Sequence, residues 1–121
     1  MDHEFKTIDG GSKLARLKAP KQSACIDYSI AAAEIAVMAN EAGIDGSKEP
    51  SMVELARVQK ASHTSALDFI CAHIDERDEI DRDWLDQNVT AMDVISAATA
   101  LLASRNPKPA TVGNSDAGRD S

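Results

Sequence analysis

Apolar residues recur with a helical period over most of residues 23–105, at spacings of three or four positions. No segment alternates apolar and polar residues with the period of two that indicates a β-strand. The periodic segments predict three longer helices and one short helix, at 23–42, 52–77, 82–88 and 91–105. We therefore expect an all-α fold, a small helical bundle with disordered N- and C-terminal arms.

Local signals mark some of the helix ends. Ser23 can cap the first helix, because its hydroxyl can accept a hydrogen bond from an unpaired backbone N–H. Ser51 and Glu54 have the spacing of a capping box, in which each side chain bonds the backbone N–H of the other residue. Neither glycine nor proline occurs between Ser51 and Pro107, so the sequence leaves open whether the helix breaks between 78 and 90.

The two ends of the chain differ from its centre in composition. Residues 1–20 mix charges with glycines and show no sustained period, and residues 106–121 carry few side chains that could be buried. We expect 1–20 to be a mobile N-terminal arm, 21–105 to be the helical bundle domain and 106–121 to be a disordered C-terminal tail.

The helix expected at 23–42 is apolar on two opposite sides, which indicates burial on two sides. A narrow acidic stripe, formed by Asp27, Glu34 and Glu41, runs between them. In so short a chain, either a central position or contact with another copy would bury both sides, and we favour contact with another copy. The residues expected at this protein interface are Ile26, Ile30, Ala33, Ile35, Val37 and Met38.

Residues 74–88 form the most acidic stretch of the chain and contain its single tryptophan, Trp84. An EF-hand calcium loop starting at Asp81 would need glycine and glutamate where Asp86 and Met92 stand, so that motif fails. We expect a solvated helix end, with Trp84 covering the core; the alternative is an acidic docking surface with Trp84 as its anchor. The residues of this alternative acidic interface are Asp75, Glu76, Asp78, Glu79, Asp83, Trp84 and Asp86.

The formal net charge is −7, and most of it lies in the centre of the chain. Residues 22–105 hold fifteen acidic and six basic residues. Such a domain repels the nucleic-acid backbone, and the four scattered aromatic residues offer no platform for base stacking. We therefore expect no direct contact with nucleic acid.

The histidines and cysteines do not form a metal-binding or catalytic pattern. Cys71 and His73 stand two positions apart on one helix and project to nearly opposite sides, so they cannot share a zinc ion. His73 falls on an apolar face, as a hydrogen-bonded core or interface imidazole would. Cys25 and Cys71 are expected to be buried and reduced, although their spacing leaves a disulfide open. Nucleophile-elbow, P-loop and dinucleotide motifs are absent, so we expect no enzymatic activity, metal or cofactor.

The N-terminal residues lack the apolar segment of a signal peptide, and no run approaches the ~18 apolar residues of a membrane span. We therefore expect a cytoplasmic protein that does not contact a membrane. The expected function is that of a non-enzymatic protein–protein interaction module or adaptor, homo-oligomeric through helix 23–42. The alternative is an inhibitor or regulator that presents the acidic surface 75–86 to a basic, nucleic-acid-binding partner.

Overall fold

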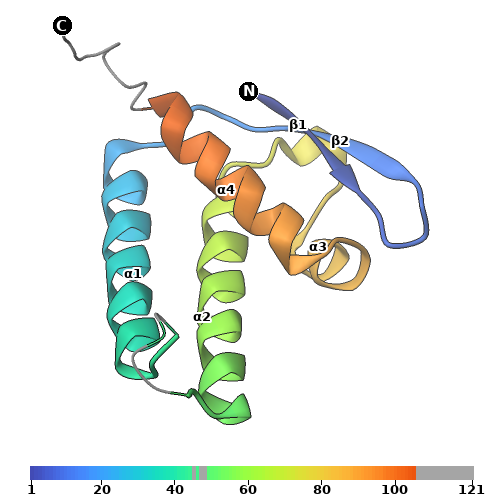
Figure 1. The fold of residues 1–121 in the computed structure, drawn as a ribbon. Helices are drawn as coiled ribbons and strands as arrows, with labels where there is room; N and C mark the ends of the chain where they lie inside the picture. The colour runs from blue at the N-terminus through green and yellow to red at the C-terminus, as the bar shows by residue number, and fades with distance from the viewer. Residues whose placement is uncertain (45, 47–48, 106–121) are drawn as a thin grey trace, which may run out of the picture.

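The computed structural model describes residues 1–44, 46 and 49–105 of the chain. Within this part, four α-helices and one short 3-10 helix follow a two-stranded antiparallel sheet (Figure 1). The bounds of these elements are β1 Asp2–Lys6, β2 Ser12–Arg16, α1 Gln22–Glu41, α2 Met52–Cys71, η1 Glu76–Asp78, α3 Arg82–Asn88 and α4 Ala91–Arg105.

The all-α expectation is wrong, because the N-terminal residues expected to be a disordered arm form an antiparallel hairpin. Its strands pair with Phe5 opposite Lys13 and with His3 opposite Ala15. Gly10 permits the turn between them, with a φ of +96°. Each strand has five residues and one fully buried side chain, which is Phe5 in β1 and Ala15 in β2. A strand with a single core residue shows no apolar alternation, which is why the sequence pattern does not reveal it.

The four predicted helices are present, and one of them is shorter than expected. The first, third and fourth helices have bounds at or next to the predicted ones. The capping box at Ser51 and Glu54 is confirmed, with both of its hydrogen bonds formed. The helix expected at 52–77 ends at Cys71. The tail expected at 106–121 lies outside the described residues.

Carboxylates mark the break that follows α2. The Asp75 side chain accepts a hydrogen bond from the N–H of Arg77 at the start of η1. The Asp81 side chain accepts one from the N–H of Trp84 at the start of α3. Between them, Glu79 adopts a left-handed φ of 55°. Acidic side chains therefore begin both η1 and α3 in a stretch that has neither glycine nor proline.

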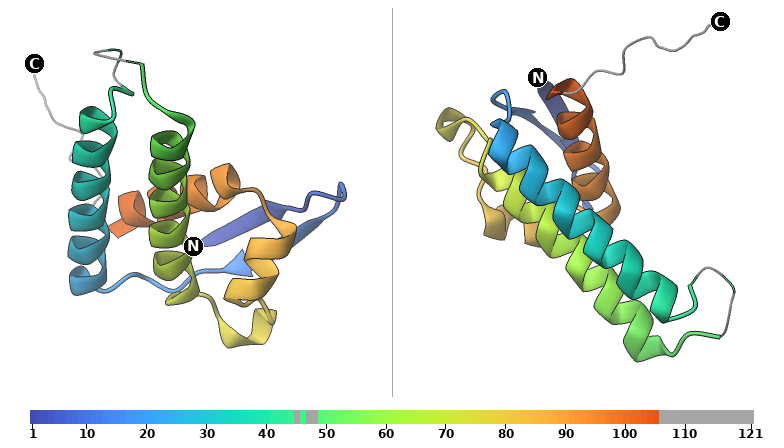
Figure 2. Two further views of the ribbon diagram at one scale, coloured as in Figure 1. Left: turned by 90° about the horizontal axis from the view of Figure 1, so that it is seen from below. Right: turned by 90° about the vertical axis from the view of Figure 1, so that its left-hand side faces the viewer.

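Helices α1 and α2 lie side by side as a helical hairpin, and α4 crosses α2 (Figures 1 and 2). The two-stranded sheet lies beside α4 and η1. Seen from the side of α1, the C-terminal end of α1 and the N-terminal end of α2 extend beyond the other helices (Figure 2). These ends of α1 and α2 therefore have no covering layer within the described part of the chain.

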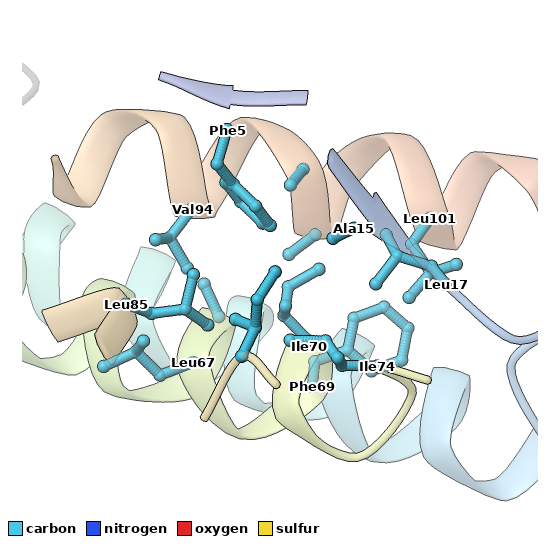
Figure 3. Packing of buried hydrophobic residues seen from close by; sticks show 14 of the residues in the cluster. Phe5, Ala15, Leu17, Leu67, Phe69, Ile70, Ile74, Leu85, Val94 and Leu101 are labelled. Atoms are coloured by element: carbon cyan, nitrogen blue, oxygen red, sulfur yellow. The ribbon is translucent and has the colours of Figure 1, made fainter. Parts of the chain in front are cut away.

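The hydrophobic core lies where the sheet, α3, α4 and the second half of α2 meet (Figure 3). Its largest fully buried side chains are those of Phe5, Ile70, Leu85, Val94 and Leu101. In contrast, α1 contributes one buried residue, Cys25. Helix α1 is therefore a peripheral helix, and its second apolar side is not buried within the described part of the chain.

Candidate protein–protein interface

The outer face of α1 is apolar and open to solvent. Tyr28 marks the inner side of the helix, because its ring stacks on Phe69 of α2 with centroids 4.6 Å apart. Ile26 and Ile30 each stand two positions from Tyr28 and project about 200° away from it. They are 49% and 53% exposed, respectively. Two large apolar side chains on α1 therefore point away from α2.

The same geometry divides the six residues predicted for this interface. Ile35 is half-buried and lines a hollow between α1 and α2, and Met38 lines a groove there with Arg57. Val37, two positions after Ile35, projects outward and is 57% exposed. We call the outward set the outer face of α1. It consists of Ile26, Ile30, Ala33 and Val37.

No charged residue interrupts the outer face of α1. The three acids of this helix, Asp27, Glu34 and Glu41, lie along one edge of the face, seven residues apart. The other edge carries uncharged side chains, among them Ser29 and Ala36. A helix that meets only water on one side normally carries charges there. The outer face therefore has the chemistry of a protein contact surface.

Beside the uncharged edge, residues of α1 and of the end of α4 line an open groove with a volume of about 620 Å³. Its walls include Ser29 and Ile30 of α1 and Arg105 of α4. Arg105 is the one charged residue in this lining, and it has no ion-pair partner among the described residues. Sequence reasoning missed Arg105, because only the crossing of α4 places it next to α1.

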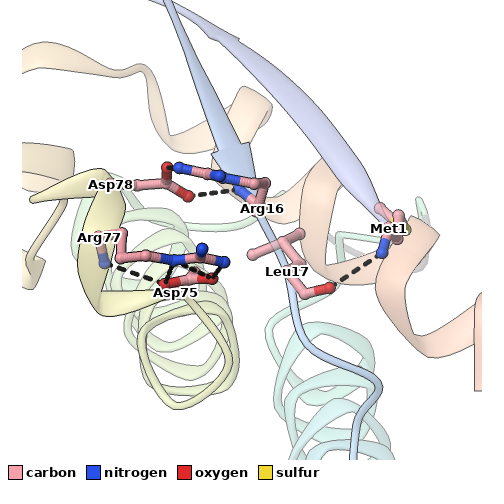
Figure 4. A network of polar contacts seen from close by, with 6 residues as sticks. All are labelled: Met1, Arg16, Leu17, Asp75, Arg77 and Asp78. Carbon is pink, nitrogen blue, oxygen red and sulfur yellow. Dashed lines mark hydrogen bonds and ion pairs between the residues drawn. The ribbon is translucent and has the colours of Figure 1, made fainter.

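Two carboxylates of the acidic run bind arginine side chains, and one of these contacts joins the run to the N-terminal hairpin (Figure 4). The Asp78 carboxylate accepts hydrogen bonds from the guanidinium of Arg16 at 2.6 Å and from the Arg16 backbone N–H at 2.7 Å. Asp75 accepts a hydrogen bond of 2.6 Å from Arg77. These hydrogen bonds lower the pKa of Asp78 and, strongly, that of Asp75. Next to them, the amino group of Met1 donates to the carbonyl of Leu17 at 2.9 Å.

The other residues of the alternative acidic interface have different environments. Trp84 is half-buried against the core, and the ammonium of Lys13 lies 5.8 Å from its ring centroid. The remaining acids are exposed: Glu76, Glu79, Asp83 and Asp86. The structure thus separates two carboxylates that have partners from four that face solvent.

The histidines and cysteines lie in or beside the core. His73 is buried, with Nδ1 2.7 Å from the carbonyl oxygen of Phe69. The Nε2 atom of His63 is buried without a hydrogen-bond partner in the described structure. Cys25 and Cys71 are free thiols, and burial raises the pKa of Cys71. Across the described residues, no three His, Cys, Asp or Glu side chains come together as a metal ion would need.

Comparisons with known proteins add no relatives to this description. No family model matches the chain, and no curated protein or solved structure matches it significantly. Of the helices in the described ranges, none has the length and apolar character needed to cross a membrane. What this chain does must therefore be inferred from its own residues.

Proposed function

We propose that the protein is a non-enzymatic interaction module that associates with a second copy of itself through the outer face of α1. One observation supports this most directly. Ile26, Ile30 and Val37 are each about half exposed on an uncharged face that points away from α2. The inner side of α1 packs on α2 (Figure 2). Of the other described elements, α4 comes close to this face at its end, where Arg105 lines the open groove.

The expected gain from covering this face is moderate. Complete burial of an isoleucine or valine side chain contributes about 1.5–3 kcal/mol, so covering the exposed half contributes on the order of 1 kcal/mol for each residue. The stripe from Ile26 to Val37 is only about 17 Å long at ~1.5 Å per residue. An interface of this size is typical of weak, reversible association. We therefore propose a dimer whose population changes with concentration.

The acidic surface 75–86 is the second candidate and has less support. Asp75 and Asp78 already bind arginine side chains of this chain, and Trp84 packs on the core. Of the residues named for this interface, a basic partner would thus meet four exposed carboxylates. The location in the cytoplasm also stays a prediction.

The test compares two substitutions that introduce the same charge at exposed sites. Ile30→Asp places a carboxylate in the outer face of α1, whereas Ala56→Asp places one on α2, at an exposed position turned away from α1. Sedimentation equilibrium should show that Ile30→Asp stays monomeric at concentrations where the wild type and Ala56→Asp associate. Equal molar masses for all three proteins would reject the proposed function.

A further inference from the structure

We infer that the two copies pair with their α1 helices parallel, so that Arg105 of each copy lies beside Asp27 of the other. This inference rests on the proposed function, since it concerns how the same face is covered. It follows from three features of the described residues: the spacing of the outer face, the chemistry of its two edges and the place of Arg105.

The outer face of α1 has the spacing of a coiled-coil seam. Ile26, Ile30, Ala33 and Val37 follow each other at intervals of four, three and four residues. In heptad terms Ile30 and Val37 occupy a positions, while Ile26 and Ala33 occupy d positions. β-branched residues at a positions are common in coiled coils, and this spacing sets the seam without fixing its orientation. The seam can therefore pack against a second copy, and the residues beside it decide the orientation.

The edges of the seam also distinguish the two orientations. The acids Asp27, Glu34 and Glu41 all occupy e positions, and the g positions within the helix, among them Ser29 and Ala36, are uncharged. Parallel helices place each e edge beside the g edge of the partner. Antiparallel helices place the two e edges beside each other. The three carboxylates of one copy would then lie next to the three of the second copy. Repulsion between like charges thus disfavours the antiparallel dimer.

Arg105 of α4 lies beside the uncharged edge of α1, level with the first turns of that helix. The groove that it lines includes Gln22 and Ser29, the two g positions in that part of the helix. In a parallel pair, the residue opposite Gln22 of one copy is Asp27 of the second copy. In an antiparallel pair, the C-terminal half of the uncharged edge would lie there. Only the parallel dimer gives the guanidinium of Arg105 an acidic partner.

Cysteine cross-linking tests the orientation. With Cys25→Ala and Cys71→Ala removing the native thiols, Ile30→Cys and Val37→Cys are introduced separately. A parallel pair brings each position next to itself in the second copy, so both variants should form disulfide-linked dimers under a mild oxidant. In an antiparallel pair, only the position nearest the two-fold axis lies close to the same position of the second copy. Linkage at one of the two positions, or at neither, would overturn the inference; Ala56→Cys is the unlinked control.

A charge exchange tests the contact itself and keeps the native thiols, so it stands even if the cysteine-free variant does not fold. Arg105→Glu and Asp27→Lys should each weaken dimerisation about threefold to tenfold, because each substitution changes two rim contacts per dimer. Combined in one chain, they recreate the ion pair with exchanged charges and should restore the dissociation constant to within about twofold. Additive weakening in the double variant would overturn the inference.

The two proposals fail in different ways. If the wild type is monomeric, or if Ile30→Asp associates as the wild type does, the proposed function fails. If the wild type associates and Ile30→Asp does not, while cross-linking or charge exchange gives the contrary result, the parallel arrangement alone fails.

Discussion

At the scale of single residues, three carboxylates of the acidic run make structural contacts within the fold. Asp78 holds Arg16 of the N-terminal hairpin, Asp75 caps η1 and Asp81 caps α3. The sequence shows the charges, but it does not show that Arg16 reaches Asp78, because the strand that carries Arg16 has no recognisable pattern. The expectation of a solvated helix end therefore described only the exposed carboxylates of this run.

The contact between Arg16 and Asp78 makes stability depend on pH in the acid range. Hydrogen bonds from Arg16 lower the pKa of Asp78 in the folded state, so this contribution is complete above the ordinary aspartate pKa of about 4 and disappears as the pH falls through the folded-state value. We expect Asp78→Asn to be less stable than the wild type at pH 7, with a smaller difference at pH 3, in urea denaturation. Glu76→Gln, which alters an exposed carboxylate, is the control. A difference that does not change with pH would contradict this account.

The buried Nε2 atom of His63 has no partner in the described structure. An unsatisfied buried polar atom destabilises a protein by about 1–3 kcal/mol. We expect His63→Leu, which removes the polar atoms at similar volume, to raise the free energy of unfolding by about 1 kcal/mol in urea denaturation. A loss of stability would show that the imidazole makes a contact that this structure does not contain.

At the scale of elements, the helices are predictable and the strands are not. Helices α1, α2 and α4 extend over fifteen or twenty residues, long enough for a helical period to appear. Strands β1 and β2 have five residues each and bury one side chain each, too few for a period of two. The outer face of α1 follows from the same helical period, whereas Arg105 joins it only through the tertiary arrangement.

Although the N-terminal β-hairpin is short, it contributes side chains to the hydrophobic core. Phe5 is fully buried, so Phe5→Ala should lower the free energy of unfolding by about 3–5 kcal/mol in urea denaturation. Leu14→Ala, on the same hairpin but 53% exposed, should change it by less than about 1 kcal/mol. Similar small effects for both variants would mean that the hairpin does not pack on the helices in solution.

At the scale of the whole molecule, the core and the proposed interface lie in different places. The core joins the sheet, α3, α4 and the second half of α2, and α1 attaches to this unit mainly by its inner side. A substitution on the outer face of α1 should therefore change association while leaving the free energy of unfolding of the monomer nearly unchanged. This separation is what makes the interface testable.

The most direct test of self-association is the molar mass of the wild-type chain measured by sedimentation equilibrium over a wide range of micromolar concentrations. We predict a rise from the monomer mass towards twice that value, because covering the apolar outer face of α1 drives the association. A molar mass that stays at the monomer value up to the highest concentration would contradict the proposal that α1 binds a second copy.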